Sequence, residues 1–170
     1  REYQGPSDLM AVFTRPAKRS PLTVADFAFA AEELQVLTAL LKNAVAQREP
    51  GVNVLLYGPP GTGKTELAKV AGEAAGLELY EVEYADRDGN SLSGRDRYRS
   101  LQISQVFLKG SQNVALLFDE VEDVFPPIST DAAQLMARMD TGDGAALTGS
   151  VSGKAWVNQI LETNPVPVIW

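Results

Sequence analysis

The chain has 170 residues, which suits one domain of ordinary size, and 45% of them are apolar, enough for a packed core. Lys and Arg number 15 against 22 Asp and Glu, and the net charge of −7 argues against non-specific binding to nucleic acid or an anionic membrane. The sequence contains no Cys and no His, so disulfides, zinc sites with the usual ligands and a histidine general base are excluded.

No apolar run approaches the roughly 18 residues that span a bilayer, and no signal peptide is visible. We therefore expect a soluble cytoplasmic domain with no membrane partner. The chain begins with Arg1 rather than Met and ends on the apolar run 166–170, so we expect a piece of a longer protein.

Residues 1–25 are rich in proline and are predicted to form an irregular lead-in. A helix is predicted over 26–47, and Pro50 and Gly51 end it. Its apolar residues recur at intervals of three and four, which places them on one face: Leu34, Leu37, Leu41 and Val45.

From residue 52 onward, strands and helices alternate. Short apolar runs predict buried strands at 52–57, 79–84, 114–118 and 166–170. Helices are predicted between them at 63–76, 95–108 and 154–163, and the stretch 126–153, rich in Pro, Gly, Ser and Thr, is predicted to be a long excursion. The alternation predicts an α/β fold, with a parallel sheet flanked by helices on both faces.

A phosphate-binding loop is predicted between the first of these strands and the next helix. Its residues match the pattern G-x-x-x-x-G-K-[ST]: Gly58, Pro59, Pro60, Gly61, Thr62, Gly63, Lys64 and Thr65. The glycines let the backbone N–H groups turn toward phosphate oxygens, and the N-terminus of the helix adds its own N–H groups. Lys64 is expected to reach the β- and γ-phosphates of ATP, and Thr65 to ligate Mg²⁺.

Two carboxylates follow the apolar run 114–118, at the carboxyl end of a strand where ligands bind in such sheets. Asp119 is expected to hold Mg²⁺ with Thr65, and Glu120 to polarise the attacking water as general base. The alternative is that either residue caps a following helix. A strand–helix unit, 77–109, separates the loop from this pair, and no Asn-Lys-x-Asp stretch for guanine is present, so adenine is favoured.

With these two motifs, the sequence resembles the AAA family of ring-forming ATPases. The similarity covers about residues 22–170, and it implies a P-loop NTPase core over 26–170. The implied sheet order is 5-1-4-3-2 with the fifth strand missing, which leaves 52–57 at the sheet edge. The resemblance also implies self-association into a ring, with a hexamer expected, and a protein substrate.

In the family, a short segment before the first core helix lines the adenine. By its place in the chain, the segment Asp26, Phe27 and Ala28 is similar to it, and Glu66 after the loop is counted with the nucleotide contacts. Asp26 has the alternative of capping a helix, and Phe27 that of a core residue.

The chain departs from the family pattern in three ways. Where substrate-threading members carry an aromatic loop, residues 91–94 contain no aromatic. The family's polar sensor follows the strand that here ends at Trp170, so the sensor, the helical lid and the arginine finger are absent from these residues. The excursion 126–153 is also longer than simple members need. We therefore expect this chain alone to hydrolyse ATP weakly.

Arg95, Arg97 and Arg99 crowd the first turns of a predicted helix, where the helix dipole disfavours cations by about 0.3–1 kcal/mol each. Either they form a solvated face helped by Asp96, or they meet an anionic partner, such as an acidic neighbour in a ring or a nucleic-acid strand.

Three functions are compatible with these features. The first is an ATPase that remodels a protein or complex within a ring. The second is a DNA-handling AAA module, which the three arginines favour and the net charge of −7 opposes. The third is a binding switch that reads ATP without turning it over, which Glu120 opposes because a switch needs no catalytic carboxylate.

Overall fold

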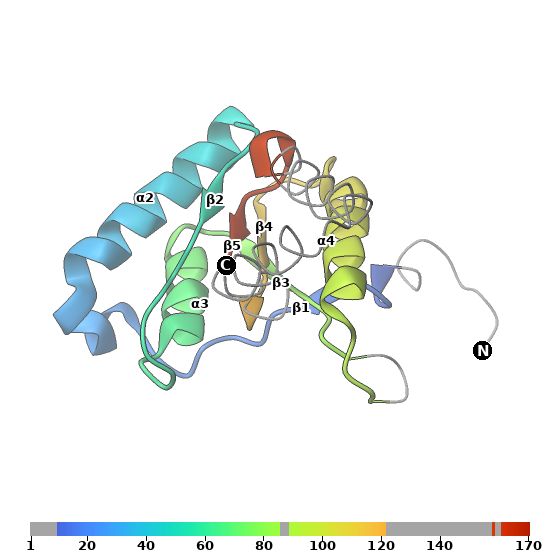
Figure 1. The fold of residues 1–170 in the computed structure, drawn as a ribbon. Helices are drawn as coiled ribbons and strands as arrows, with labels where there is room; N and C mark the ends of the chain where they lie inside the picture. Colours follow the sequence, from blue (N-terminus) through green and yellow to red (C-terminus); the bar gives the residue numbers. More distant parts are fainter. Residues whose placement is uncertain (1–9, 86–88, 122–157, 159–160) are drawn as a thin grey trace, which may run out of the picture.

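The computed structural model describes residues 10–85, 89–121, 158 and 161–170 (Figure 1). In chain order the elements are β1 (Thr14–Pro16), η1 (Val24–Ala30), α2 (Ala31–Gln47), β2 (Asn53–Val54), α3 (Lys64–Ala74), β3 (Glu78–Val82), α4 (Gly94–Leu108), β4 (Val114–Leu117) and β5 (Val168–Ile169). The predicted excursion 126–153 and most of the predicted helix 154–163 lie outside the described residues.

The strands form one mixed sheet in the order β1-β3-β4-β5-β2. The pairs β3–β4, β4–β5 and β5–β2 are parallel, so the four predicted strands take the predicted 1-4-3-2 order, with β2 at one edge. At the other edge β1 pairs antiparallel with β3. The lead-in 1–25, expected to be irregular, therefore contains a strand. Its Arg15 bonds to Glu81 at 3.1 Å and to Glu83 at 3.3 Å.

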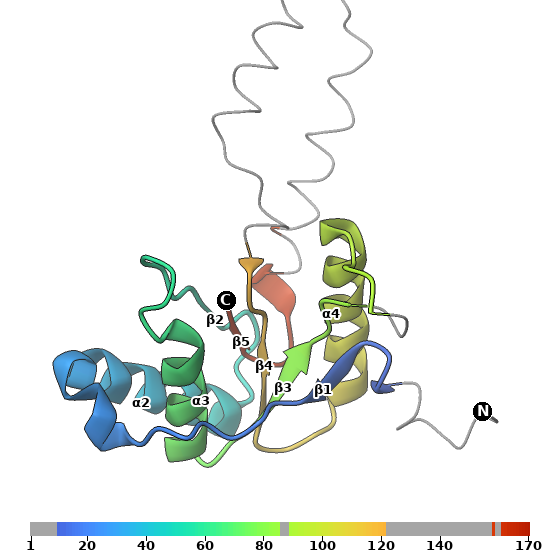
Figure 2. The ribbon, with the colours of Figure 1, turned by 90° about the horizontal axis from the view of Figure 1, so that it is seen from below.

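Helices cover both faces of the sheet (Figure 2). Alternate residues of β4 serve the two faces because successive strand side chains point to opposite sides. Ala115 and Leu117 pack with η1, α2 and α3, whereas Leu116 and the following Phe118 pack with α4. The sheet is thus the middle layer of three, and each of its faces has its own apolar core.

The predicted helix 26–47 is divided into two parts. The 3₁₀ segment η1 comes first, with a non-helical backbone at Phe27 (φ −104°, ψ 31°), and α2 begins at Ala31. The predicted stripe faces the core: Leu34, Leu37 and Leu41 are buried and Val45 is partly buried. No helix among the described residues is long and apolar enough to cross a membrane.

The strand β2 is shorter than the predicted 52–57, and it is only partly buried. It lies at the edge and has one neighbour, β5, so its outer side has no partner strand among the described residues. Leu55 and Tyr57 are exposed as a result, although Leu56 still donates its N–H to the Trp170 carbonyl at 2.8 Å. The chain then leaves the carboxyl end of the sheet as the predicted phosphate loop.

Candidate nucleotide site

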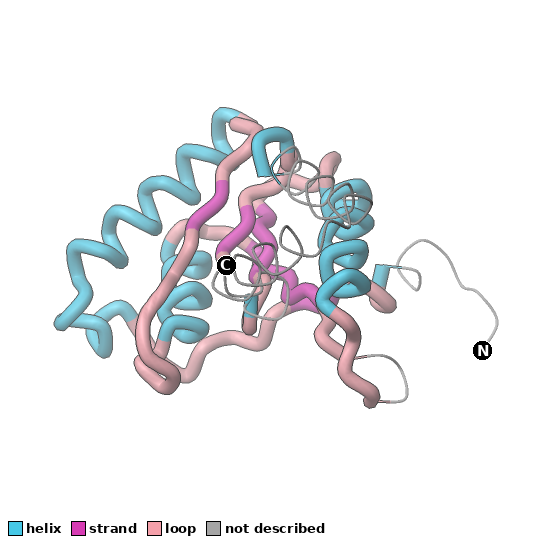
Figure 3. Tube along the Cα trace, viewed as in Figure 1, coloured by secondary structure: helices cyan, strands magenta, loops and turns pink. Residues whose placement is uncertain are grey.

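The phosphate loop connects β2 to α3 (Figure 3). Gly61 and Gly63 have φ values of 75° and 85°, a region that costs an ordinary residue roughly 1–2 kcal/mol. Gly63 is the N-cap of α3, and the helix begins at Lys64. The first N–H groups of α3 therefore open onto the loop, as an anion-binding helix end requires.

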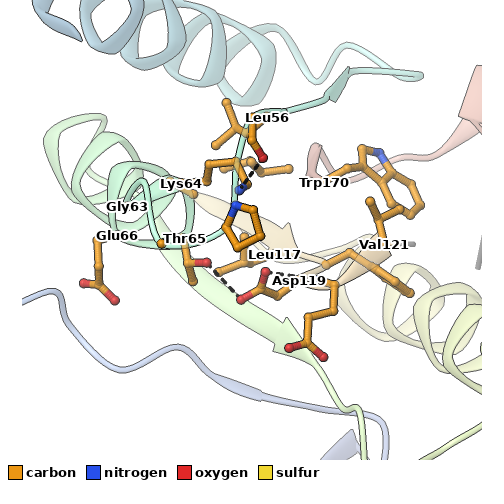
Figure 4. A pocket seen from close by; sticks show the side chains of 16 residues that line it. Leu56, Gly63, Lys64, Thr65, Glu66, Leu117, Asp119, Val121 and Trp170 are labelled. Carbon is orange, nitrogen blue, oxygen red and sulfur yellow. Dashed lines mark hydrogen bonds between the residues drawn. The ribbon is translucent and has the colours of Figure 1, made fainter. Parts of the chain in front are cut away.

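Lys64 lies across this loop (Figure 4). Its ammonium group donates to the carbonyls of Gly58 and Pro59, each at 3.0 Å. An ammonium has three donors, so this geometry leaves one for a phosphate oxygen held in the loop. The loop thus places a positive charge where phosphates would bind.

The loop and the acidic pair meet at Thr65 and Asp119, which are 54 residues apart. The Thr65 hydroxyl donates to Asp119 Oδ2 at 2.9 Å (Figure 4). Asp119 Oδ1 accepts the Glu120 N–H at 3.0 Å. A hydroxyl beside a carboxylate is a hard-oxygen pair, and Mg²⁺ is usually held by one or two such protein oxygens together with phosphates and water. These two side chains therefore fit the predicted metal.

A cleft of about 710 Å³ surrounds this pair, a volume typical of small-molecule sites. Its walls come from the loop, α3 and the carboxyl ends of β4 and β5. The predicted residues that line it are Gly58, Pro60, Gly61, Gly63, Lys64, Thr65, Glu66, Asp119 and Glu120. Pro59 and Thr62 belong to the loop without lining the cleft, and the Thr62 hydroxyl donates to the Pro59 carbonyl at 2.9 Å.

Glu66 lines the cleft, but its carboxylate bonds elsewhere. It lies beyond Thr65 on the side away from Asp119 (Figure 4), and Lys69 Nζ is 3.2 Å from its Oε1. Hydrogen bonding from Ser20, and then from Lys69, lowers the pKa of Glu66. A nucleotide contact from Glu66 would therefore come from its backbone N–H.

Asp26, Phe27 and Ala28 do not line the cleft. Asp26 accepts bonds from the N–H and the hydroxyl of Thr23 at 2.7 and 2.8 Å, and these bonds lower its pKa. It is the N3 residue of a capping box whose N-cap is Thr23, so its capping role is real but differs from the N-cap considered above. Phe27 is buried and 3.7 Å from where a Cβ on Gly63 would lie, so it supports the loop, whereas Ala28 is exposed. An adenine contact by these three residues stays a prediction.

Glu120 follows Asp119 with a left-handed backbone, φ 53°. A non-glycine residue rarely takes this conformation, and it costs roughly 1–3 kcal/mol unless its surroundings hold it. The side chain is exposed and lines the cleft. Glu120 is therefore a carboxylate at the cleft wall on a backbone that needs support.

Sequence reasoning missed that support, which comes from Arg97 on α4. Arg97 is 1% exposed, and its guanidinium donates to the carbonyls of both Asp119 and Glu120, the latter at 2.8 Å. It also lies 4.4 Å from the ring centre of Phe118. Both interpretations of the three arginines, a solvated face and an anionic partner, are wrong for Arg97 because it is buried within the chain. Arg95 and Arg99 are exposed, and Arg99 is 3.8 Å from Asp96.

One signal could have identified Arg97. It lies four, seven and eleven residues before three buried residues of α4, so it belongs to the helix's inward stripe. These residues are Leu101, Ser104 and Leu108.

Trp170 packs against Phe118 beside the cleft, with the two rings tilted by 38°. Its ring centre is 5.0 Å from that of Phe118, and its indole N–H donates to Asn53 Oδ1 at 3.1 Å. Trp170 also lines the cleft, so a line of contacts runs from β2 through Trp170 and Phe118 to Arg97.

A mostly parallel sheet with this loop and an acidic strand end defines the class of P-loop nucleotide-binding proteins. The family model "ATPase family associated with various cellular activities (AAA)" matches residues 54–167, more than half of the chain. The chain belongs to the AAA family, and this membership implies ATP binding.

Curated relatives agree with this assignment. ATP-dependent zinc metalloprotease FtsH 1 of Salinibacter ruber is 34% identical over 95% of the chain and 22% of its own length. A spastin homolog of Caenorhabditis elegans is 31% identical over 66% of the chain and 22% of its own length. Probable inactive ATP-dependent zinc metalloprotease FTSHI 4 of Arabidopsis thaliana is 37% identical over 45% of the chain and 10% of its own length. The chain thus spans less than a quarter of each of these relatives.

Proposed function

We propose that this chain is the Mg²⁺-dependent ATP-binding and ATP-hydrolysing core of an AAA ATPase. The observation that carries the proposal is the 2.9 Å bond between Thr65 and Asp119. It joins the phosphate loop to the acidic strand end, so the groups for phosphate, metal and water belong to one cleft.

In this proposal, the loop N–H groups and Lys64 bind the phosphates, while Thr65 and Asp119 hold Mg²⁺, Asp119 directly or through water. When bound, Mg²⁺ would neutralise charge on the β- and γ-phosphate oxygens. Glu120 takes a proton from the water as the water oxygen bonds to the γ-phosphorus, and the bond to the leaving ADP oxygen breaks. The chain has no histidine, so a carboxylate is the available base at this position.

The wider role is that of a ring-forming remodelling ATPase. We propose that the whole protein assembles as a ring, expected to be a hexamer, and acts on a protein or protein complex. The relatives support this by name only: two are called zinc metalloproteases and one a spastin homolog. The 170 residues contain no His or Cys, so a protease zinc site of the usual ligands does not lie within them.

A nucleotide switch without turnover is the second candidate, because one relative is named probable inactive. Glu120 opposes it, since the carboxylate lines the cleft beside Asp119. The DNA-handling alternative has lost part of its support, because buried Arg97 cannot contact a nucleic-acid strand.

Two substitutions test the proposal on the full-length gene product. Lys64→Ala should abolish detectable binding of a fluorescent ATP analogue, because the phosphates lose their main charge partner. Glu120→Gln should bind the analogue within about threefold of wild type but lose roughly 10²–10⁴-fold in phosphate release, because an amide cannot accept the proton.

Lys42→Ala and Glu32→Gln are the matched controls, since both residues are exposed on α2. Both should behave as wild type. Equal binding by wild type and Lys64→Ala would contradict the site, and wild-type turnover in Glu120→Gln would contradict its role as base. A wild-type protein that binds ATP without phosphate release would favour the switch.

A further inference from the structure

Two consecutive backbone carbonyls beside the cleft, those of Asp119 and Glu120, accept hydrogen bonds from one buried cation, Arg97. Arg97 Nη1 donates to the Glu120 carbonyl at 2.8 Å, and Nη2 donates to the Asp119 carbonyl. The two peptide groups that flank the Glu120 Cα atom are therefore both tied to α4. This fixes the backbone on which the Glu120 carboxylate is carried.

The contact depends on the shape of the guanidinium group. Its planar fork can reach two carbonyls at once, whereas a lysine ammonium is a compact charge on a flexible stem. The ring centre of Phe118 lies 4.4 Å from the guanidinium carbon, and Arg97 is almost fully buried. Both its position and its plane are therefore restricted.

The backbone that Arg97 holds would be unfavourable alone. Glu120 has φ 53°, and such a conformation persists where surrounding contacts determine it. The loop residues do not supply these contacts, because Lys64 bonds to Gly58 and Pro59 and Thr65 bonds to the Asp119 side chain. The backbone of the strand-end turn, residues Asp119 and Glu120, and the phosphate loop are thus held by different groups.

We propose that Arg97 is a positioning residue: it holds the Glu120 carboxylate where it can take a proton from the attacking water. It does not contribute to nucleotide affinity. This inference rests on the proposed function, in which Glu120 is the general base. Arg97 acts through the backbone of the strand-end turn, and it touches neither the nucleotide nor the water.

The test separates binding from turnover in Arg97→Lys, with Arg95→Lys and Arg99→Lys as controls on the same helix. Arg97→Lys keeps the charge but lacks the planar pair of N–H donors that bonds to both carbonyls at once. It should bind the fluorescent ATP analogue within about threefold of wild type and melt within a few degrees of it. Its turnover should fall about 10- to 100-fold, a loss typical of a misplaced reacting group. Both controls should match wild type in all three measurements.

Arg97→Gln provides a second variant if the lysine form does not fold, because its neutral amide can donate to one carbonyl without burying an ammonium. Turnover within twofold of wild type in the folded variant would overturn the inference. So would a parallel loss of affinity, melting temperature and turnover, because that pattern marks a purely structural residue.

Glu120→Gln in the same assay distinguishes failure of the proposed function from failure of the role of Arg97. Normal turnover in Glu120→Gln would reject the proposed function itself. Slow turnover in Glu120→Gln combined with normal turnover in Arg97→Lys would reject only the role of Arg97.

Discussion

The phosphate loop and the strand-end turn at Asp119 and Glu120 face the same cleft but are held in different ways. Within the loop, Lys64 and Thr62 bond to carbonyls no more than six residues away. The backbone of the turn is held by Arg97, which is 22 and 23 residues distant, and only the Asp119 side chain bonds to Thr65, 54 residues away.

This difference explains what a substitution in each region should do. A local loop depends on backbone freedom at a few positions, so a change there should act mainly on ligand binding. The turn lies on packing between β4, β5 and α4, so removing a packed apolar side chain beneath it should reach the stability of the whole domain. Measuring nucleotide affinity and the free energy of unfolding on the same variants tests this difference between loop and turn.

The largest expected effect is that of Phe118→Ala. Phe118 is 0% exposed and contacts both Arg97 and Trp170, so its removal leaves a cavity beneath the turn. The free energy of unfolding should fall by about 3–5 kcal/mol in urea denaturation. Val106→Ala, at a position on α4 that is 76% exposed, should change the free energy of unfolding by less than about 0.5 kcal/mol. Similar effects of the two variants would show that the turn has no packing support.

A smaller loss of stability is expected from Gly63→Ala. A Cβ at Gly63 would meet Phe27 only at ordinary contact distance, but φ 85° is unfavourable for alanine by roughly 1–2 kcal/mol. Unfolding should show this cost, and ATP-analogue affinity should fall as well, because the loop N–H groups shift. The control is Gly110→Ala, which has open space around it. Loss of stability without loss of ATP-analogue affinity would show that the loop is not part of the nucleotide site.

The same contrast separates what the sequence could predict from what it could not. Fixed spacing encodes the loop and the strand-end carboxylates, and apolar runs encode the order of the parallel strands. The strand β1 was missed because three residues that include Pro16 carry no periodic signal. It forms by pairing with the otherwise open edge of β3, a contact that depends on residues more than 60 positions away.

Arg97 shows a related limit. The identical residue type at positions 95, 97 and 99 suggested one shared role, whereas the helical period turns only the middle arginine inward. Its partners are the backbone carbonyls of Asp119 and Glu120, and Glu120 has a left-handed backbone that the sequence does not indicate. The capping box that uses Asp26 likewise depended on where η1 begins.

A double-mutant cycle between Thr65 and Asp119 decides whether loop and turn form one metal–nucleotide site. Thr65→Val, Asp119→Asn and the double variant would be compared with wild type for Mg²⁺-dependent affinity toward a fluorescent ATP analogue. A shared site predicts a coupling free energy of about 0.5–3 kcal/mol. The double variant should then bind the analogue almost as well as the single variant that binds it more weakly. Effects that add to within about 0.3–0.5 kcal/mol would show that the two residues act separately, and would contradict a shared site.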